Sequence, residues 1–158
     1  RELGEKLAGI HIERCLASPL SRAAETARLA LAGRDVPLEL CDGLKEQHMG
    51  DFENKDYARL LEEFPEQVTG MLEDWSLFPP PGGESYEQVY ERTGAVIRSV
   101  LERGEDTLIV GHNGALATIF VRLLDMQPKA VNHIWLLHGC YSSIVIGSGM
   151  TRLEYFNR

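Results

Sequence analysis

Cysteine is scarce in this chain, and long hydrophobic runs are absent. Only three of the 158 residues are cysteines (Cys15, Cys41 and Cys140), they are widely spaced, and no C-x-x-C pair occurs. An odd number without such a pair argues against a disulfide framework and favours reduced thiols, so we expect a cytoplasmic protein. No apolar run approaches the ~20 residues that a membrane-spanning helix needs, so we expect no membrane partner.

Positive charge is also in short supply. Lysine and arginine total 16 against 24 aspartates and glutamates, which gives a formal net charge of −8. This balance argues against nucleic acid as a partner. It also means that any pocket for an anionic ligand must be locally basic, so the few well-placed cations are informative.

Several catalytic signatures are missing as well. The sequence contains no G-x-S-x-G, no G-x-x-x-x-G-K-[ST] and no H-E-x-x-H motif. Its five histidines follow no recurrent metal-ligand spacing. We therefore expect neither a metal nor an organic cofactor.

What is present begins with an apolar strand that leads to a histidine. Residues 107–110 are apolar or β-branched, and Gly111 and Gly114 favour a sharp turn into a helix. The spacing places His112 at the carboxyl end of a parallel strand, where ligands bind in open α/β sheets. Free N–H groups at the start of the following helix can receive an anion such as phosphate. The alternative is a surface histidine in an ordinary turn.

A second segment carries a cation at a similar place. Residues 15–17 form a short apolar run, and Ser18 and Pro19 suit the N-cap and first position of a helix. Arg22 then lies in the first turn, where its planar guanidinium can bind phosphate. A cation at this end opposes the helix dipole, and a bound anion would offset that effect. The alternative is a solvated helix arginine.

Strand and helix patterns alternate along the chain, with short turns between them. This alternation predicts a single α/β domain over residues 1–158, with a mainly parallel sheet flanked by helices. The expected elements are a helix from Tyr86 to Gly104, a strand at 106–110, a helix around 119–124, two amphipathic helices at 57–64 and 68–75, and a hairpin of 142–146 with 151–156.

Three blocks occur in a characteristic order: residues 18–22, residues 44–53 (LKEQHMGDFE) and residues 111–114. A fourth block, 82–85 with Arg92 downstream, accompanies them. In this order the blocks resemble the histidine phosphatase superfamily, also called the phosphoglycerate mutase-like family, and the fourth is typical of its phosphatase branches. The resemblance spans nearly the whole chain and implies a Rossmann-like three-layer α/β/α fold.

The resemblance also implies roles for individual residues. Arg22 and Asn113 would bind the transferred phosphate. Glu46 would donate and accept the proton, and His112 would be the second catalytic histidine, which stabilises the phosphoryl group in flight. Ser85 fits the N-cap of the helix at Tyr86, with a capping box, and is a lesser candidate for a substrate contact.

Elementary chemistry agrees with these roles. Hydrolysis of a phosphate monoester is very slow without a catalyst, so an enzyme needs a nucleophile, cations for the equatorial oxygens and an acid for the leaving alkoxide. Arg22 is permanently charged, whereas His112 must be protonated to act as a cation. A nearby phosphate dianion would favour that by raising the pKa of His112. Glu46 is the candidate acid.

One departure from the family pattern is large. The family's nucleophilic histidine lies in an Arg-His-Gly segment that ends an N-terminal strand, and this sequence has none. His11 lacks the preceding apolar strand and the neighbouring arginine and glycine, so it cannot substitute. We therefore expect the 158-residue chain to be an N-terminally truncated domain that is inactive alone. Strands left unpaired would invite self-association, such as a homodimer.

The expected function is hydrolysis of a small phosphorylated metabolite through a phosphohistidine intermediate. The compact blocks resemble bacterial phosphatases of the superfamily, with the α-ribazole phosphatases of cobalamin nucleotide-loop assembly as the nearest single group. Residues 54–80 would form a helical cap that helps to choose the substrate. Two alternatives remain open: a phosphoglycerate mutase-type phosphotransferase and a non-catalytic phosphate-binding module.

Overall fold

The centre of the molecule is a parallel sheet of three strands in the order β2-β1-β3. The computed structural model describes residues 2–74 and 78–158. In the register of the sheet, Leu16 lies opposite Glu39 on one side and Ile109 on the other. The strands are β1 (Arg14–Ala17), β2 (Leu38–Leu40) and β3 (Thr107–Val110). The predicted strand that leads to His112 is confirmed, whereas β2 is too short to show a pattern in the sequence.

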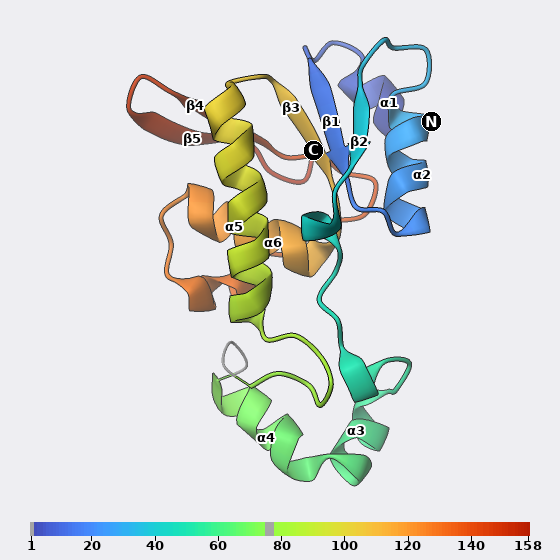
Figure 1. Cartoon of the computed structure of the whole chain (residues 1–158), viewed down its shortest axis with the longest axis vertical. Coiled ribbons are helices and arrows are strands. Elements are labelled where there is room, and N and C mark those ends of the chain that lie inside the picture. The colour runs from blue at the N-terminus through green and yellow to red at the C-terminus, as the bar shows by residue number, and fades with distance from the viewer. Residues whose placement is uncertain (1, 75–77) are drawn as a thin grey trace.

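Helices cover both faces of this sheet (Figure 1). Cys15 and Ala17 of β1 pack with Ala27 on one face. Leu16, which points the other way, packs with Ile97 and Ile119 on the opposite face. This alternation confirms the three-layer α/β/α fold with a mainly parallel sheet. The first face carries α1 (Glu2–Leu7) and α2 (Ser21–Ala30), and the second carries α5 (Tyr86–Arg103) and α6 (Asn113–Leu123).

Helix α2 begins later than the sequence pattern predicts. Leu20, in an extended conformation, is its N-cap residue and makes no side-chain cap. Ser18 lies before the helix, and its Oγ accepts a hydrogen bond from the N–H of Leu20 (3.3 Å). The predicted N-cap role of Ser18 is therefore wrong, because its hydroxyl serves the turn between strand and helix. Arg22 nevertheless lies in the first turn of α2, as predicted.

Helix α5 begins and ends where the sequence predicts. Ser85 and Gln88 form the expected capping box. At the other end Gly104 adopts a left-handed conformation (φ 66°), and its N–H donates to the carbonyl of Val100. Glycine adopts that conformation without the steric penalty of a side chain, so it is a common residue after a helix.

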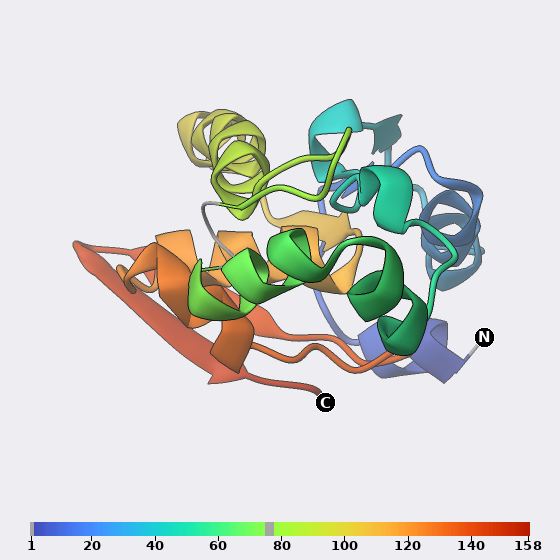
Figure 2. The same ribbon diagram turned by 90° about the horizontal axis from the view of Figure 1, so that it is seen from below.

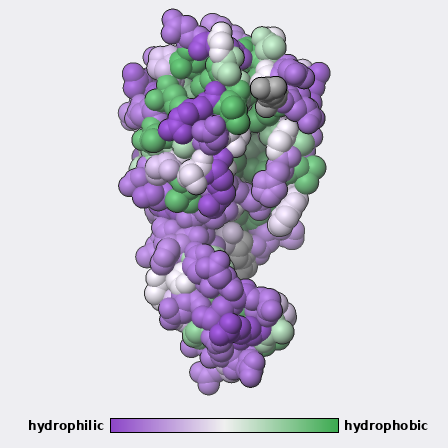
Figure 3. All heavy atoms as spheres, turned by 90° about the vertical axis from the view of Figure 1, so that its right-hand side faces the viewer, coloured by the Kyte–Doolittle hydropathy of each residue, from purple (hydrophilic) through white to green (hydrophobic). Residues whose placement is uncertain are grey.

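Two short helices form a lobe beyond the carboxyl ends of the strands (Figure 1). From below, this lobe lies in front of the rest of the molecule (Figure 2). The face of the lobe that Figure 3 shows is mostly hydrophilic, and a narrow waist joins the lobe to the main body in that view. The helices are α3 (Tyr57–Glu63) and α4 (Pro65–Asp74). Both predicted helices of this region are thus confirmed, but Trp75, which we placed in the second, lies outside the described residues.

The chain ends in the predicted hairpin, which forms a separate antiparallel sheet of β4 (Ser143–Gly147) and β5 (Met150–Tyr155). Ser148 and Gly149 connect the strands, both with positive φ (51° and 75°), as in the two-residue turns that match the twist of a hairpin. Short 3-10 helices at Asp42–Leu44, Gly50–Phe52 and Pro128–His133 complete the elements of the described chain. None of the described helices combines the length and apolarity that a membrane span requires.

Candidate active site

His112 lies where β3 turns into α6. It is the N-cap residue of that helix, in an extended conformation, and only 8% of its surface is exposed. Its Nε2 lies 2.9 Å from Oγ of Ser18, a residue at the carboxyl end of the neighbouring strand β1. The two strands are in register here, because the N–H of Ser18 donates to the carbonyl of Val110 (2.9 Å). His112 thus occupies the sheet edge that the sequence predicts.

Glu46 reaches the same helix terminus. Its carboxylate accepts hydrogen bonds from the N–H groups of Gly114 (3.2 Å) and Ala115 (3.1 Å). Gly114 is needed for this approach, since a Cβ at that position would lie 2.7 Å from Glu46 Oε1. The N–H groups that we expected to be free for phosphate are therefore occupied. The anion at the start of α6 is a carboxylate of the chain itself, which the dipole of the helix favours.

The charges around His112 make its neighbourhood basic. Burial lowers the pKa of His112, the positive charges of Arg22 and Arg92 lower it further, and the carboxylate of Glu46 opposes them. The imidazole is therefore neutral at neutral pH. A phosphate dianion beside it would counter the two arginines and favour the imidazolium form. Two positive charges near His112 agree with the expectation that a chain of net negative charge binds an anion where it is locally basic.

The guanidinium of Arg22 is available to a ligand. It lies exposed on the first turn of α2. In residues 2–74 and 78–158 its side chain forms no hydrogen bond or ion pair, whereas its carbonyl accepts a bond from the hydroxyl of Thr26 (2.7 Å). Its charge still acts on His112, because it helps to lower the pKa of that residue. A guanidinium without protein acceptors can direct its donors toward a phosphate.

Asn113 and Ser85 both hold structural positions. Oδ1 of Asn113 accepts a hydrogen bond from the N–H of Leu136 (2.7 Å), which fixes the segment before the hairpin. Its Nδ2 makes no hydrogen bond to the described part of the chain, so that donor can still bind phosphate. Oγ of Ser85 accepts from the N–H of Gln88 (3.2 Å), and the side chain of Gln88 accepts in return from the N–H of Ser85 (2.8 Å). A substrate contact by Ser85 stays a prediction.

Two further residues near the site were given no role of their own by the sequence. Tyr86 has the spacing of a core residue in α5, but its hydroxyl lies close to the site: a Cβ on Gly114 would be 2.9 Å from it. Burial, together with the charge of Glu46, raises the pKa of Tyr86 to about 12. Arg92 was noted only as part of a motif, yet its guanidinium binds the loop that carries Glu46. Tertiary packing decides both positions, and the local pattern does not record it.

The other histidines contact different parts of the molecule. Nδ1 of His48 lies 3.1 Å from the carbonyl of Gly82. His11 lies before β1, at the opposite edge of the sheet from His112, as expected for a residue that cannot replace the nucleophile. Side-chain ligand atoms of His11, Glu13 and Asp106 lie within 4.8 Å of one another, but all three residues are exposed. Exposed groups of this kind are common without an ion, and the absence of a metal stays a prediction.

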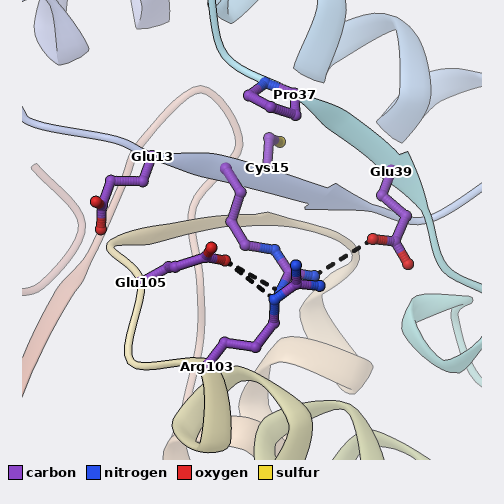
Figure 4. A pocket seen from close by; sticks show the side chains of 7 residues that line it. Glu13, Cys15, Pro37, Glu39, Arg103 and Glu105 are labelled. Atoms are coloured by element: carbon purple, nitrogen blue, oxygen red, sulfur yellow. Dashed lines mark hydrogen bonds and ion pairs between the residues drawn. The ribbon is translucent and has the colours of Figure 1, made fainter.

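A cavity of about 130 Å³ lies at the amino ends of the strands, away from His112 (Figure 4). The side chain of Arg14 is buried there and forms ion pairs with Glu39 (3.4 Å) and Glu105 (3.5 Å). These contacts connect β1 to β2 and to the segment between α5 and β3. Burial raises the pKa of the neighbouring Cys15 to about 11, so the thiol stays protonated at neutral pH. This cavity holds an ion-pair network that supports the sheet.

Residues 1–158 match the family model of the histidine phosphatase superfamily (branch 1). The chain belongs to this superfamily. It is 34% identical over 147 residues to the adenosylcobalamin/α-ribazole phosphatase of Salmonella typhimurium, covering 92% of this chain and 73% of that protein. The Escherichia coli enzyme of the same name is 31% identical over 153 residues, covering 96% and 75%. The crystal structure of the α-ribazole phosphatase from Shigella flexneri superposes with a TM-score of 0.92 at 30% identity, covering 99% of this chain and 79% of that one.

These similarities confirm two predictions, the family and the phosphomonoester hydrolase activity. The predicted site residues lie at the carboxyl edge of the parallel sheet. Three residues come to this edge from different elements: Arg22 from α2, Glu46 from the loop after Asp42–Leu44, and His112 from the end of β3. They supply a permanent cation, a carboxyl group and a titratable imidazole.

Proposed function

We propose that this histidine phosphatase hydrolyses α-ribazole phosphate, the substrate class in the names of its bacterial relatives. The arrangement of Arg22, Glu46 and His112 around the start of α6 carries the proposal. Identity above 30% to relatives of that name supports the choice of substrate. A small phosphorylated metabolite suits a site with one exposed guanidinium and one half-buried carboxyl group.

The charges assign a step to each residue. Arg22 and Nδ2 of Asn113 bind the equatorial oxygens of the phosphate. His112 becomes protonated beside the dianion and stabilises the charge of the phosphoryl group during transfer. In its protonated form Glu46 donates a proton to the leaving alkoxide and becomes a carboxylate, and in the second half of the reaction this carboxylate accepts a proton from the attacking water, which restores the acid.

The phosphohistidine step requires a second histidine as the nucleophile. Within the described residues, the side chains of His11 and His48 form no hydrogen bond or ion pair with Arg22, Glu46 or His112. The resemblance to the family assigns the nucleophile to the histidine of an Arg-His-Gly segment. We propose that such a histidine is the nucleophile of the active enzyme. Catalytic assays therefore use the protein expressed from its complete gene.

The lobe of α3 and α4 is the proposed cap, corresponding to residues 54–80. Its position beyond the carboxyl ends of the strands supports this role, because the substrate would enter from that side (Figure 1). A cytoplasmic location and a homodimer also stay proposals. The three cysteines are free thiols, which agrees with a reducing compartment.

Release of inorganic phosphate tests the proposal. We expect the enzyme to hydrolyse α-ribazole 5′-phosphate with a higher kcat/KM than 3-phosphoglycerate, and Arg22→Ala to abolish most of this activity. Interconversion of 2- and 3-phosphoglycerate without phosphate release would instead establish a mutase. Phosphate binding without turnover of any ester would establish a non-catalytic module.

A further inference from the structure

The side chain of Arg92 binds the backbone of the loop that leads to Glu46. Arg92 lies on the second turn of α5, and its guanidinium donates to three carbonyl oxygens. Nη1 donates to Gly43 (2.9 Å) and Lys45 (2.7 Å), and Nη2 donates to Glu46 itself (3.1 Å). A planar fork of donors suits several acceptors at fixed angles, whereas the single ammonium of lysine does not.

Glu84 holds the other side of the same guanidinium. Its two oxygens accept from Nε (2.9 Å) and Nη2 (3.0 Å) of Arg92, in a bidentate pair. Burial alone would raise the pKa of Glu84, but hydrogen bonds from Arg92 and from the N–H of His48, with the charges of both residues, outweigh it and lower the pKa. Glu84 is therefore a carboxylate at neutral pH and a constant partner for Arg92.

Glu84 also bonds to the chain immediately after Glu46. Its Oε2 accepts from the N–H of His48 (2.9 Å), and its carbonyl accepts from Nε2 of Gln47 (2.7 Å). The carbonyl of His48 accepts in turn from the N–H of Glu84 (2.8 Å). Glu46 is thus held on both sides: Arg92 binds the residues up to it, and Glu84 binds the residues that follow it.

We propose that Glu84 and Arg92 form a clamp that positions the carboxyl group of Glu46 for proton transfer. This inference rests on the proposed function, in which Glu46 protonates the leaving group. The clamp touches only the backbone of Glu46, so both members are positioning residues. They fix the loop, while the N–H groups of Gly114 and Ala115 hold the carboxylate in front of His112.

A clamp with this role differs from a merely stabilising contact in its dependence on the leaving group. An alkyl phosphate needs a proton donor because an alkoxide is a poor leaving group. p-Nitrophenyl phosphate releases a stable phenolate and needs little protonation. Misplacement of Glu46 therefore lowers hydrolysis of an alkyl phosphate more than hydrolysis of p-nitrophenyl phosphate. Loss of folded protein lowers both equally.

The test compares kcat/KM for glycerol 2-phosphate and p-nitrophenyl phosphate in the enzyme expressed from its complete gene. Arg92→Lys and Glu84→Gln are each expected to lower the alkyl-to-aryl ratio by about tenfold or more. Glu46→Gln is expected to lower the ratio at least as far, and Arg92→Lys in the Glu46→Gln background should lower it no further.

Arg122→Lys is the matched control. Like Arg92, Arg122 donates to a backbone carbonyl, that of Tyr90 (3.0 Å), and pairs with a glutamate, Glu91 (3.4 Å). Its hydrogen bonds go to α5, and none goes to the loop of Glu46. We expect this variant to leave the ratio within about twofold of the parent.

An unchanged ratio in Arg92→Lys and Glu84→Gln would overturn the clamp, even if both activities fell together. If Arg92→Lys does not fold, the ratio of Glu84→Gln decides in the same way. Failure of the proposed function gives a different result: the parent enzyme hydrolyses neither ester, or Glu46→Gln itself leaves the ratio unchanged.

Discussion

The substitution Gly114→Ala separates the stability of the fold from the chemistry of the site. Gly114 is the second residue of α6, and its N–H donates to Glu46. A Cβ at this position would lie 2.7 Å from Oε1 of Glu46 and 2.9 Å from the hydroxyl of Tyr86. Both are the far ends of side chains, so the backbone can stay in place. Because Glu46 is the more flexible of the two, its carboxylate is expected to move away from the helix.

Gly114→Ala is expected to change the free energy of unfolding only slightly and the rate of hydrolysis strongly. Alanine in place of glycine stabilises a helix by up to about 1 kcal/mol. Loss of the carboxylate's hydrogen bonds opposes this by about 1.5–3 kcal/mol, at the lower end here because the carboxylate can reach water. The free energy of unfolding should therefore fall by only about 1 kcal/mol. Removal of a general acid usually lowers the rate about 10² to 10⁴-fold, so kcat/KM for an alkyl phosphate should fall about a hundredfold.

Urea denaturation and phosphate release from glycerol 2-phosphate measure the two effects. Gly94→Ala is the matched control, because Gly94 is also a helix glycine whose Cβ would meet the end of a charged side chain, that of Arg122. We expect Gly94→Ala to change stability but not the preference between alkyl and aryl esters. If Gly114→Ala kept alkyl phosphatase activity within threefold of the parent, the assigned position of Glu46 would be wrong.

Three further predictions concern single residues. Arg22→Ala should lower kcat/KM about a hundredfold and leave the melting temperature within about 2 °C. The reason is that the exposed side chain is proposed to bind the substrate phosphate and forms no hydrogen bond or ion pair with the described part of the chain; a large loss of stability would contradict this. The pKa of His112 is lower in the folded chain than in the unfolded one, so its contribution to stability is complete above about pH 6.5 and is lost as the pH falls below it; His112→Gln should weaken this acid dependence in urea titrations at pH 5 to 8, and an identical pH dependence would refute it. Ser85→Ala removes the cap of α5 and should lower the free energy of unfolding by about 1 kcal/mol, measured by calorimetry, and no loss would contradict the capping role.

The sequence predicted those parts of the structure whose signals are local. The strand that ends at Val110, the capping box at Ser85 and the hairpin of 142–146 with 151–156 each depend on neighbouring residues, and each was confirmed. His112 could be placed at the sheet edge for the same reason. A parallel strand that is followed by a glycine-flanked turn places the residue in that turn, here His112, at the carboxyl edge of the sheet.

The remainder depends on contacts between distant segments. Ser18 has the sequence signature of an N-cap, but its hydroxyl lies against His112, 94 residues away. Glu46 occupies the N–H groups of α6, which the local pattern presents as free. Arg92 binds carbonyls 46 to 49 residues before it in the chain. No propensity or periodicity encodes such pairs, because only the packing of the whole sheet edge brings them together.

The most direct test of the site is the effect of His112→Ala on phosphate release by the enzyme expressed from its complete gene. If His112 stabilises the phosphoryl group in flight, kcat/KM for α-ribazole 5′-phosphate should fall at least a hundredfold, about 2.7 kcal/mol of transition-state stabilisation, while circular dichroism stays unchanged. Activity within tenfold of the parent, a loss below about 1.4 kcal/mol, would contradict the account.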